Sequence, residues 1–143
     1  MSEQGGAKLV RTFFDNISAH DVSRNDVLKG DGYMFEGPGL PARVDWEGGQ
    51  RYIQNFINAF PDLRFDLTLT VAQGDHVVAH WTATGTHDGA LMSPSGNAVP
   101  ATHKKVTTVG SSTFEIKNGK FIHGWTFWDM AGFLVQLGLM PPM

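Results

Sequence analysis

A single carboxylate, Asp129, stands among large apolar side chains in the segment 120–138. These apolar neighbours are Phe121, Trp125, Phe127, Trp128, Met130 and Phe133. Burying an acid among them would cost free energy, because removal from water disfavours its charged form. Such a carboxyl group either moves a proton at a substrate carbon or caps a helix that begins beside it. The two interpretations predict opposite shifts of its pKa, upward for the proton carrier and downward for the cap.

Four other side chains could assist proton transfer or bind a polar substrate group. His123 is the candidate second proton carrier, and the alternative is a strand histidine that a neighbour satisfies. His87, in a Gly-Thr-His-Asp-Gly turn, either contacts a ligand or fixes the loop. The Tyr33 hydroxyl could polarise a carbonyl group. The Ser112 hydroxyl could hydrogen-bond a carbonyl but cannot replace an imidazole as a base.

The alternation of side chains along a strand predicts which of these residues share a face. In the expected strand 120–128, the set that shares the face of Asp129 is Phe121, His123, Trp125 and Phe127. Across the Asn118-Gly119 hairpin turn, Ser112 belongs to the matching set. We therefore expect a substrate-binding surface made of Tyr33, Phe35, Phe56, His87, Ser112, Trp125 and Phe127. The alternative for each phenylalanine is a place in the hydrophobic core.

Periodicity predicts the elements that must position these residues. Apolar spacing predicts helices and strands, which we place as follows: helices at 6–20, 23–29, 46–60 and 130–137, and strands at 32–36, 64–72, 75–86, 103–117 and 120–128. Ser23 and Asp45 are candidate caps of the second and third helices, and Pro61 is expected to end the third. Pro/Gly-rich stretches at 37–43 and 91–101 predict loops. Helices followed by long strands are typical of an α+β fold. We expect a curved, mostly antiparallel sheet wrapped around helices, with an internal pocket.

The composition restricts the possible partners. A chain of 143 residues suits one domain over residues 1–143, and a net charge of −3 argues against nucleic acid as a partner. The chain has no cysteine, so disulfides and thiolate metal sites are excluded, and we expect no metal site. No apolar run approaches the roughly 20 residues of a membrane helix. With no secretory signal visible, we expect a cytoplasmic protein that does not bind membranes.

Several motifs are similar to those of a known family. They lie in the runs 58–89 and 117–138: an AFPDL helix end, an acidic Gly-Asp turn, a Gly-Thr-His-x-Gly loop, an Asn-Gly-Lys hairpin, a W-x-x-x-D step and a terminal LxQLG. Over residues 6–138 the chain resembles the SnoaL-like polyketide cyclases of the NTF2-like superfamily. The resemblance implies a cone-shaped α+β fold and no cofactor. It also implies that an aspartate at the position of Asp129 is the general acid/base in an intramolecular aldol ring closure.

The resemblance also shows a departure from the family pattern. Cyclases of this family usually have an assisting histidine on the neighbouring strand, and this chain has Ser112 at that position and Gly110 at its upstream partner. The expected function is ring closure of a small, apolar, oxygenated, polyketide-like substrate by proton transfer next to a carbonyl. An isomerase of ketosteroid type or a dehydratase is one alternative. A non-catalytic protein that binds small hydrophobic molecules is the other, and Ser112 favours it.

Oligomerisation is the last expectation from the sequence. Long strands with apolar residues on both faces need cover, and Trp81, Val109 and Trp128 are candidates for an interface. Members of the resembled family are commonly dimers or tetramers, which implies a homodimer or homotetramer.

Overall fold

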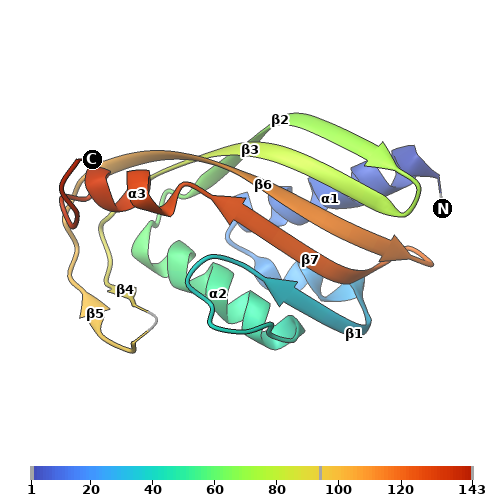
Figure 1. Cartoon of the computed structure of the whole chain (residues 1–143), viewed down its shortest axis with the longest axis horizontal. Coiled ribbons are helices and arrows are strands. Elements are labelled where there is room, and N and C mark those ends of the chain that lie inside the picture. Colours follow the sequence, from blue (N-terminus) through green and yellow to red (C-terminus); the bar gives the residue numbers. More distant parts are fainter. Residues whose placement is uncertain (1, 94, 143) are drawn as a thin grey trace.

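Five strands form one curved sheet in the order β1-β7-β6-β3-β2. The computed structural model describes residues 2–93 and 95–142. In chain order its elements are α1 (Glu3–Ser18), the 3-10 helix η1 (Val22–Leu28), β1 (Lys29–Glu36), α2 (Trp46–Ala59), β2 (Arg64–Gln73), β3 (His76–Thr86), β4 (Leu91–Met92), β5 (Ala98–Val99), β6 (Lys105–Lys117), β7 (Lys120–Trp128) and α3 (Met130–Gln136). All pairs in this sheet are antiparallel except β1 with β7. The expected α+β cone is confirmed (Figure 1).

The two long helices cover the inner face of the sheet. Helix α1 packs against β2 and β3, and α2 packs against β1. The apolar stripe of α1 recurs at the 3.6-residue period, and Val10, Phe13, Phe14 and Ile17 are all buried on it. Because the apolar stripes of the helices and the inner sheet face need each other for burial, they enclose a single core.

Helix starts follow the expected capping chemistry, with one exception. Asp45 caps α2, as expected, because its carboxylate accepts the N–H of Gly48 at 2.9 Å. Helix α1 begins three residues earlier than predicted, since Ser2 accepts the N–H of Gly5 at 3.0 Å and fixes the first turn. The predicted cap Ser23 is wrong: its hydroxyl donates to Asp21, which precedes η1.

The segment 91–101, predicted as a loop, contains a short second sheet. Strands β4 and β5, of two residues each, pair antiparallel beside α2. The Asn55 side chain of α2 holds this hairpin through both the N–H and the carbonyl of Met92, at 3.0 Å each. Two-residue strands carry too little periodicity to be seen in the sequence.

A β-bulge in β7 reverses the predicted faces of that strand. Ile116 pairs with Phe121, but the next residue back on β6, Glu115, pairs with His123, so Ile122 is an extra residue. After the bulge, the side chains at odd positions, beginning with His123, point to the outer face. The inner positions of β7 are therefore Phe121, Gly124, Thr126 and Trp128, and the outer ones are His123, Trp125 and Phe127.

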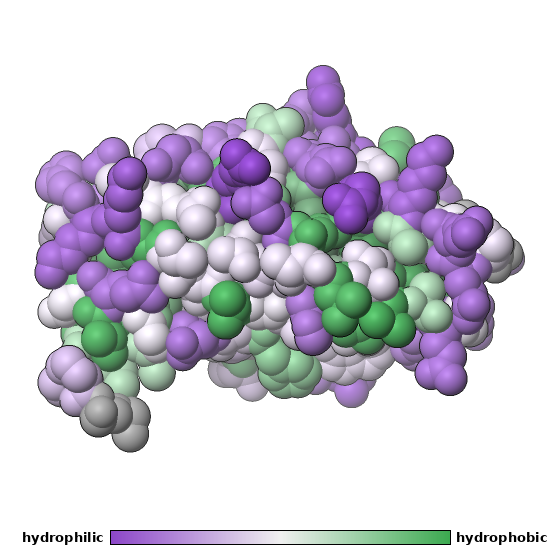
Figure 2. All heavy atoms as spheres, turned by 90° about the horizontal axis from the view of Figure 1, so that it is seen from above, coloured by the Kyte–Doolittle hydropathy of each residue, from purple (hydrophilic) through white to green (hydrophobic). Residues whose placement is uncertain are grey.

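The outer face of the sheet carries several exposed hydrophobic side chains. Phe127 is 69% exposed, Val109 57%, Leu69 52% and Val71 51%. Figure 2 looks down on the β2 side of the molecule and shows small hydrophobic groups set among hydrophilic side chains. Among the described residues, no helix combines the length and the hydropathy needed to cross a membrane.

Candidate functional site

An apolar cavity of about 110 Å³ lies between the inner sheet face and the helices. Its volume is comparable to that of the roughly 150 Å³ engineered cavity that binds benzene. The lining is mostly aromatic, and its main members are Phe13, Phe14, Tyr33, Phe35, Trp46, Tyr52, Phe56, Phe60, Phe65, Trp81, Phe114, Trp128 and Phe133. Smaller residues complete it, among them Gly49, Ala83, Gly85, Thr108, Ser112 and Thr126. A flat, mostly apolar molecule suits such a surface.

The described cavity lining contains no Asp, Glu, His, Lys or Arg side chain. Its polar groups are hydroxyls, indole N–H groups and the amide of Gln50, whose nitrogen donates to the carbonyl of Val22 at 2.8 Å. Proton transfer inside this cavity would therefore depend on a tyrosine or on a residue that enters from outside.

Tyr33 is buried in the cavity wall and stands edge-to-face on Trp46, with ring centroids 4.9 Å apart. Burial raises the pKa of its phenol well above the ordinary tyrosine value. The hydroxyl therefore stays protonated at neutral pH and can serve as a hydrogen-bond donor.

Ser112 is buried at the centre of a small polar cluster. Its hydroxyl accepts the indole N–H of Trp81 at 3.0 Å and shares a hydrogen bond of 2.9 Å with Thr126. Gly110 makes room for the Trp81 indole, because a Cβ at residue 110 would lie only 2.4 Å from that ring. The cluster satisfies the buried hydroxyl of Ser112, which lines the cavity.

Tyr52 and Trp128 connect α2 to the end of β7 across the cavity. The Trp128 indole N–H donates to the Tyr52 hydroxyl at 3.0 Å, and this hydroxyl donates to the carbonyl of Pro38 at 2.9 Å. Burial raises the pKa of Tyr52 to about 12, against the opposing effect of the Trp128 hydrogen bond. This hydroxyl therefore acts as a donor and as an acceptor within the protein.

Asp129 lies outside the cavity lining, and its side chain is exposed. Its carboxylate accepts the N–H of Gly132 at 2.8 Å, which makes it the cap of α3. The bulge at Ile122 turns residue 129 away from the inner face, so Asp129 is not buried among the aromatic side chains. Its exposure and its hydrogen bond to Gly132 are those of a helix cap.

His123 also lies outside the cavity. Its Nε2 is 2.7 Å from Glu36, and its ring stacks on Trp125 with centroids 3.7 Å apart. Glu36 is also 3.4 Å from Arg43, so His123 belongs to a surface cluster on the outer face. The structure does not bring His123 and Asp129 to a common pocket.

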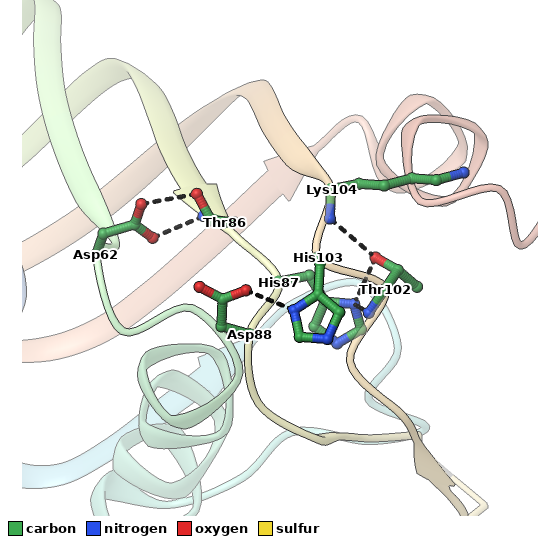
Figure 3. A network of polar contacts seen from close by, with 7 residues as sticks. All are labelled: Asp62, Thr86, His87, Asp88, Thr102, His103 and Lys104. Carbon is green, nitrogen blue, oxygen red and sulfur yellow. Dashed lines mark hydrogen bonds and ion pairs between the residues drawn. The ribbon is translucent and has the colours of Figure 1, made fainter.

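His87 joins the two ends of the segment 88–103, which connects β3 to β6 and contains β4 and β5 (Figure 3). Its ring is fully buried, and Nδ1 accepts the backbone N–H of Thr102 at 3.2 Å and lies 3.0 Å from the Thr102 hydroxyl. Its Nε2 has no hydrogen-bond partner among the described residues. The ring stacks on Phe60, a cavity residue, with centroids 5.2 Å apart. His87 therefore supports the wall from behind and is not part of the lining.

Two carboxylates complete this network near the end of β3. Asp62 accepts the N–H of Thr86 at 2.6 Å and its hydroxyl at 2.9 Å, and these hydrogen bonds lower the pKa of Asp62. Oδ1 of Asp88 is 2.9 Å from Nδ1 of His103, and this contact joins the two ends of the segment 88–103 a second time (Figure 3). Within the described residues, no three His, Cys, Asp or Glu side chains are grouped so that they could hold a metal ion.

Comparison with known proteins places the chain in a family. The profile of the SnoaL-like polyketide cyclases matches residues 8–137. The chain belongs to this SnoaL-like family. A comparison with curated protein sequences found no significant match.

Solved structures similar to this SnoaL-like protein support the fold. AclR from Streptomyces galilaeus is 22% identical with a TM-score of 0.86, over 99% of this chain and 86% of that one. TsrD from Streptomyces laurentii is 23% identical with a TM-score of 0.82, over 98% and 99%. A protein from Jannaschia sp. CCS1, assigned to the SnoaL-like polyketide cyclases, is 21% identical with a TM-score of 0.80, over 98% and 95%. Identities this low establish the architecture alone.

In this SnoaL-like protein the predicted site residues divide into two groups. Tyr33, Phe35, Phe56 and Ser112 line the cavity, while His87, His123, Trp125, Phe127 and Asp129 do not. Trp81 and Trp128 also line the cavity, although they were expected in an interface between subunits. For Trp81 a signal existed: it shares the inward period of β3 with Val77, Ala79 and Ala83, all buried.

Lowering the pH should destabilise the protein through His87. Desolvation by burial lowers the pKa of His87, against smaller opposing effects of the Gly89 backbone and Asp88. The unfolded chain then takes up the proton first, so stability is complete above the ordinary pKa of about 6.5 and is lost as the pH falls from there through the folded-state value. We expect this residue alone to add up to about 1.4 kcal/mol per pH unit to the slope.

The measurement is urea unfolding between pH 4.5 and 7.5, with His87→Asn as the comparison. An asparagine carbonyl can accept the Thr102 N–H but does not titrate in this range. The difference between the two curves gives the contribution of His87. Parallel curves for the two proteins would contradict the prediction.

Proposed function

We propose that this SnoaL-like protein binds one small, mostly apolar molecule in its cavity and holds it away from water. The observation that carries the proposal is the lining, which is largely aromatic and contains no ionisable side chain besides the two tyrosines among its described members. Each 100 Å² of apolar ligand surface that leaves water contributes roughly 2.5 kcal/mol before the entropic cost of binding. Binding, more than acid–base chemistry, is what these residues supply.

Acid–base ring closure by Asp129 is the second candidate. Family membership favours it, and so does the place of Asp129 directly after Trp128, a cavity residue. The exposure of its carboxylate and its bond to Gly132 stand against it. An isomerase or a dehydratase would need the same proton abstraction, so the same objection applies to both.

The test is incubation with small aromatic ketones, polyketide-like esters and enones, followed by mass spectrometry of the recovered compounds. We expect saturable binding, compounds recovered unchanged, and equal affinity in Asp129→Asn. Conversion by the wild-type protein that Asp129→Asn abolishes would overturn the binding proposal and establish the second candidate.

Removing the Asp129 side chain should affect stability and not binding. Asp129→Ala loses the cap of α3 and should lower the free energy of unfolding by about 1 kcal/mol. Asp129→Asn keeps a capping oxygen and should stay within a few tenths of a kcal/mol of the wild type. Chemical denaturation measures both variants. Equal stabilities of the alanine variant and the wild type would show that the cap contributes nothing.

For assembly, we propose a homodimer through the outer sheet face, where Leu69, Val71, Val109 and Phe127 are exposed. Such side chains gain from mutual burial, and the face is continuous across the five strands. The earlier candidates Trp81 and Trp128 drop out, because both line the cavity. Light scattering at micromolar concentration should give twice the chain mass or, for a tetramer, four times. A monomer would refute the proposal.

A further inference from the structure

We infer that the Tyr33 hydroxyl recognises one neutral hydrogen-bond acceptor of the ligand, such as a ketone oxygen. The inference rests on the proposed function, because it requires a ligand in the cavity. It adds the chemical class of that ligand, a mostly apolar molecule with an uncharged acceptor, and it names the residue that selects the class.

The fold fixes the Tyr33 hydroxyl at a defined point of the cavity. Tyr33 lies on β1 with only 6% of its surface exposed, and its ring forms an edge-to-face pair with Trp46. The hydroxyl oxygen lies beside Gly124 on β7, where a Cβ would come within 2.5 Å of it. A glycine at residue 124 therefore leaves the space that this hydroxyl occupies, and the bulge in β7 is what turns residue 124 inward.

This hydroxyl is unused, unlike the other buried polar groups of the lining. The indole of Trp46 donates to Asp26 at 2.8 Å, and the indole of Trp81 donates to Ser112 at 3.0 Å. Within the described part of the chain, the Tyr33 hydroxyl has no hydrogen-bond partner, and its oxygen is not fully enclosed by protein atoms. A buried hydroxyl without a partner costs free energy, which a ligand acceptor would recover.

The surroundings favour a neutral acceptor over an anionic one. No Lys, Arg or His side chain occurs in the described lining, so a carboxylate would lose its hydration without gaining a counter-charge. Burial raises the pKa of Tyr33, so the phenol remains a donor throughout the physiological range. A ketone oxygen loses much less hydration and gains one hydrogen bond.

Three probes of similar shape test the inference: acetophenone carries a ketone, cumene carries no acceptor, and benzoate carries a charge. Dissociation constants are measured by titration of tryptophan fluorescence. Tyr33→Phe should weaken acetophenone about three- to tenfold and leave cumene unchanged or tighter. Wild-type protein should bind benzoate at least about tenfold more weakly than acetophenone.

Tyr52→Phe is the matched control, because it removes the other cavity tyrosine hydroxyl, which Pro38 and Trp128 already use. It should change the affinities for acetophenone and cumene to the same extent. Thermal denaturation is a second readout: Tyr33→Phe should keep or raise the wild-type Tm, because it breaks no hydrogen bond and removes an unpartnered hydroxyl, whereas removal of a purely structural hydroxyl would lower the Tm.

The outcomes separate this inference from the proposed function. Equal losses of acetophenone and cumene affinity in Tyr33→Phe, or benzoate binding as tight as that of acetophenone, would overturn the inference alone. A wild-type protein that binds neither neutral probe would overturn the proposed function and the inference with it.

Discussion

Phe121→Ala should lower the free energy of unfolding by about 3–5 kcal/mol. Phe121 is fully buried, and its ring stacks on Phe114 with centroids 4.7 Å apart and lies 5.6 Å from Phe13. Truncation removes these contacts and leaves a cavity between the sheet and α1. The neighbouring residues cannot fill it, because hydrogen bonds hold their backbone in the sheet. Urea unfolding followed by tryptophan fluorescence measures the loss.

Phe127→Ala on the same strand is the control for the reversed faces of β7. Phe127 is 69% exposed, so its truncation should cost less than about 1 kcal/mol in the monomer. The uninterrupted alternation of the sequence analysis places both rings on one face and predicts similar costs. Similar costs would therefore contradict the bulge at Ile122.

Ala83→Leu should reduce acetophenone affinity at least tenfold. Ala83 is buried on β3 and lines the cavity, with cavity residues Phe65 and Thr108 opposite it on the two neighbouring strands. Three added carbon atoms would occupy much of a cavity of about 110 Å³, and a dense interior gives way only at a cost. Fluorescence titration of the variant with acetophenone checks the prediction.

Thr82→Leu provides the matched control for this experiment. Thr82 is the neighbour of Ala83 on β3, and its side chain points to the outer face. The same leucine side chain on the outer face should leave acetophenone affinity within twofold of the wild type. Loss of affinity in both variants would mean that the probe does not bind in the cavity.

Much of the fold could be predicted from local patterns in the sequence. The apolar period of α1, the cap Asp45 and the break at Pro61 fix the two long helices, because each rests on interactions within a few residues. The Asn118-Gly119 turn between two alternating runs predicted the β6–β7 hairpin, which the register confirms. The hairpin β4–β5 was not predicted, because its two-residue strands are defined by contacts with α2.

The candidate site was harder to predict, since it depends on which face each strand residue takes. One extra residue, Ile122, moves His123, Trp125 and Phe127 outward and Gly124 and Thr126 inward. A bulge has no clear sequence signature here, and a shift of one residue reverses every side chain beyond it. The positions of Tyr33 and Ser112 could be predicted because these residues lie on β1 and β6, outside the bulged strand.

Asp129 shows how residue type and position can lead to different conclusions. Its apolar sequence neighbours suggested burial, but Asp is also a preferred residue at the start of a helix, and α3 begins at Met130. Sequence alone left the two interpretations open. The structure distinguishes their geometry, because the bond from Gly132 and the exposed carboxylate are features of a cap.

The most direct test of the central claim uses the four tryptophans as internal reporters. Trp46, Trp81 and Trp128 line the cavity, whereas Trp125 stacks on His123 on the outer face. Acetophenone is titrated into ¹⁵N-labelled protein, and the indole N–H signals are followed by NMR after assignment with single Trp→Phe variants. We expect saturable shifts of the three cavity indoles and a stationary Trp125 signal. A saturable shift of Trp125 alone, or no shift of any indole at millimolar acetophenone, would contradict a binding function for the cavity.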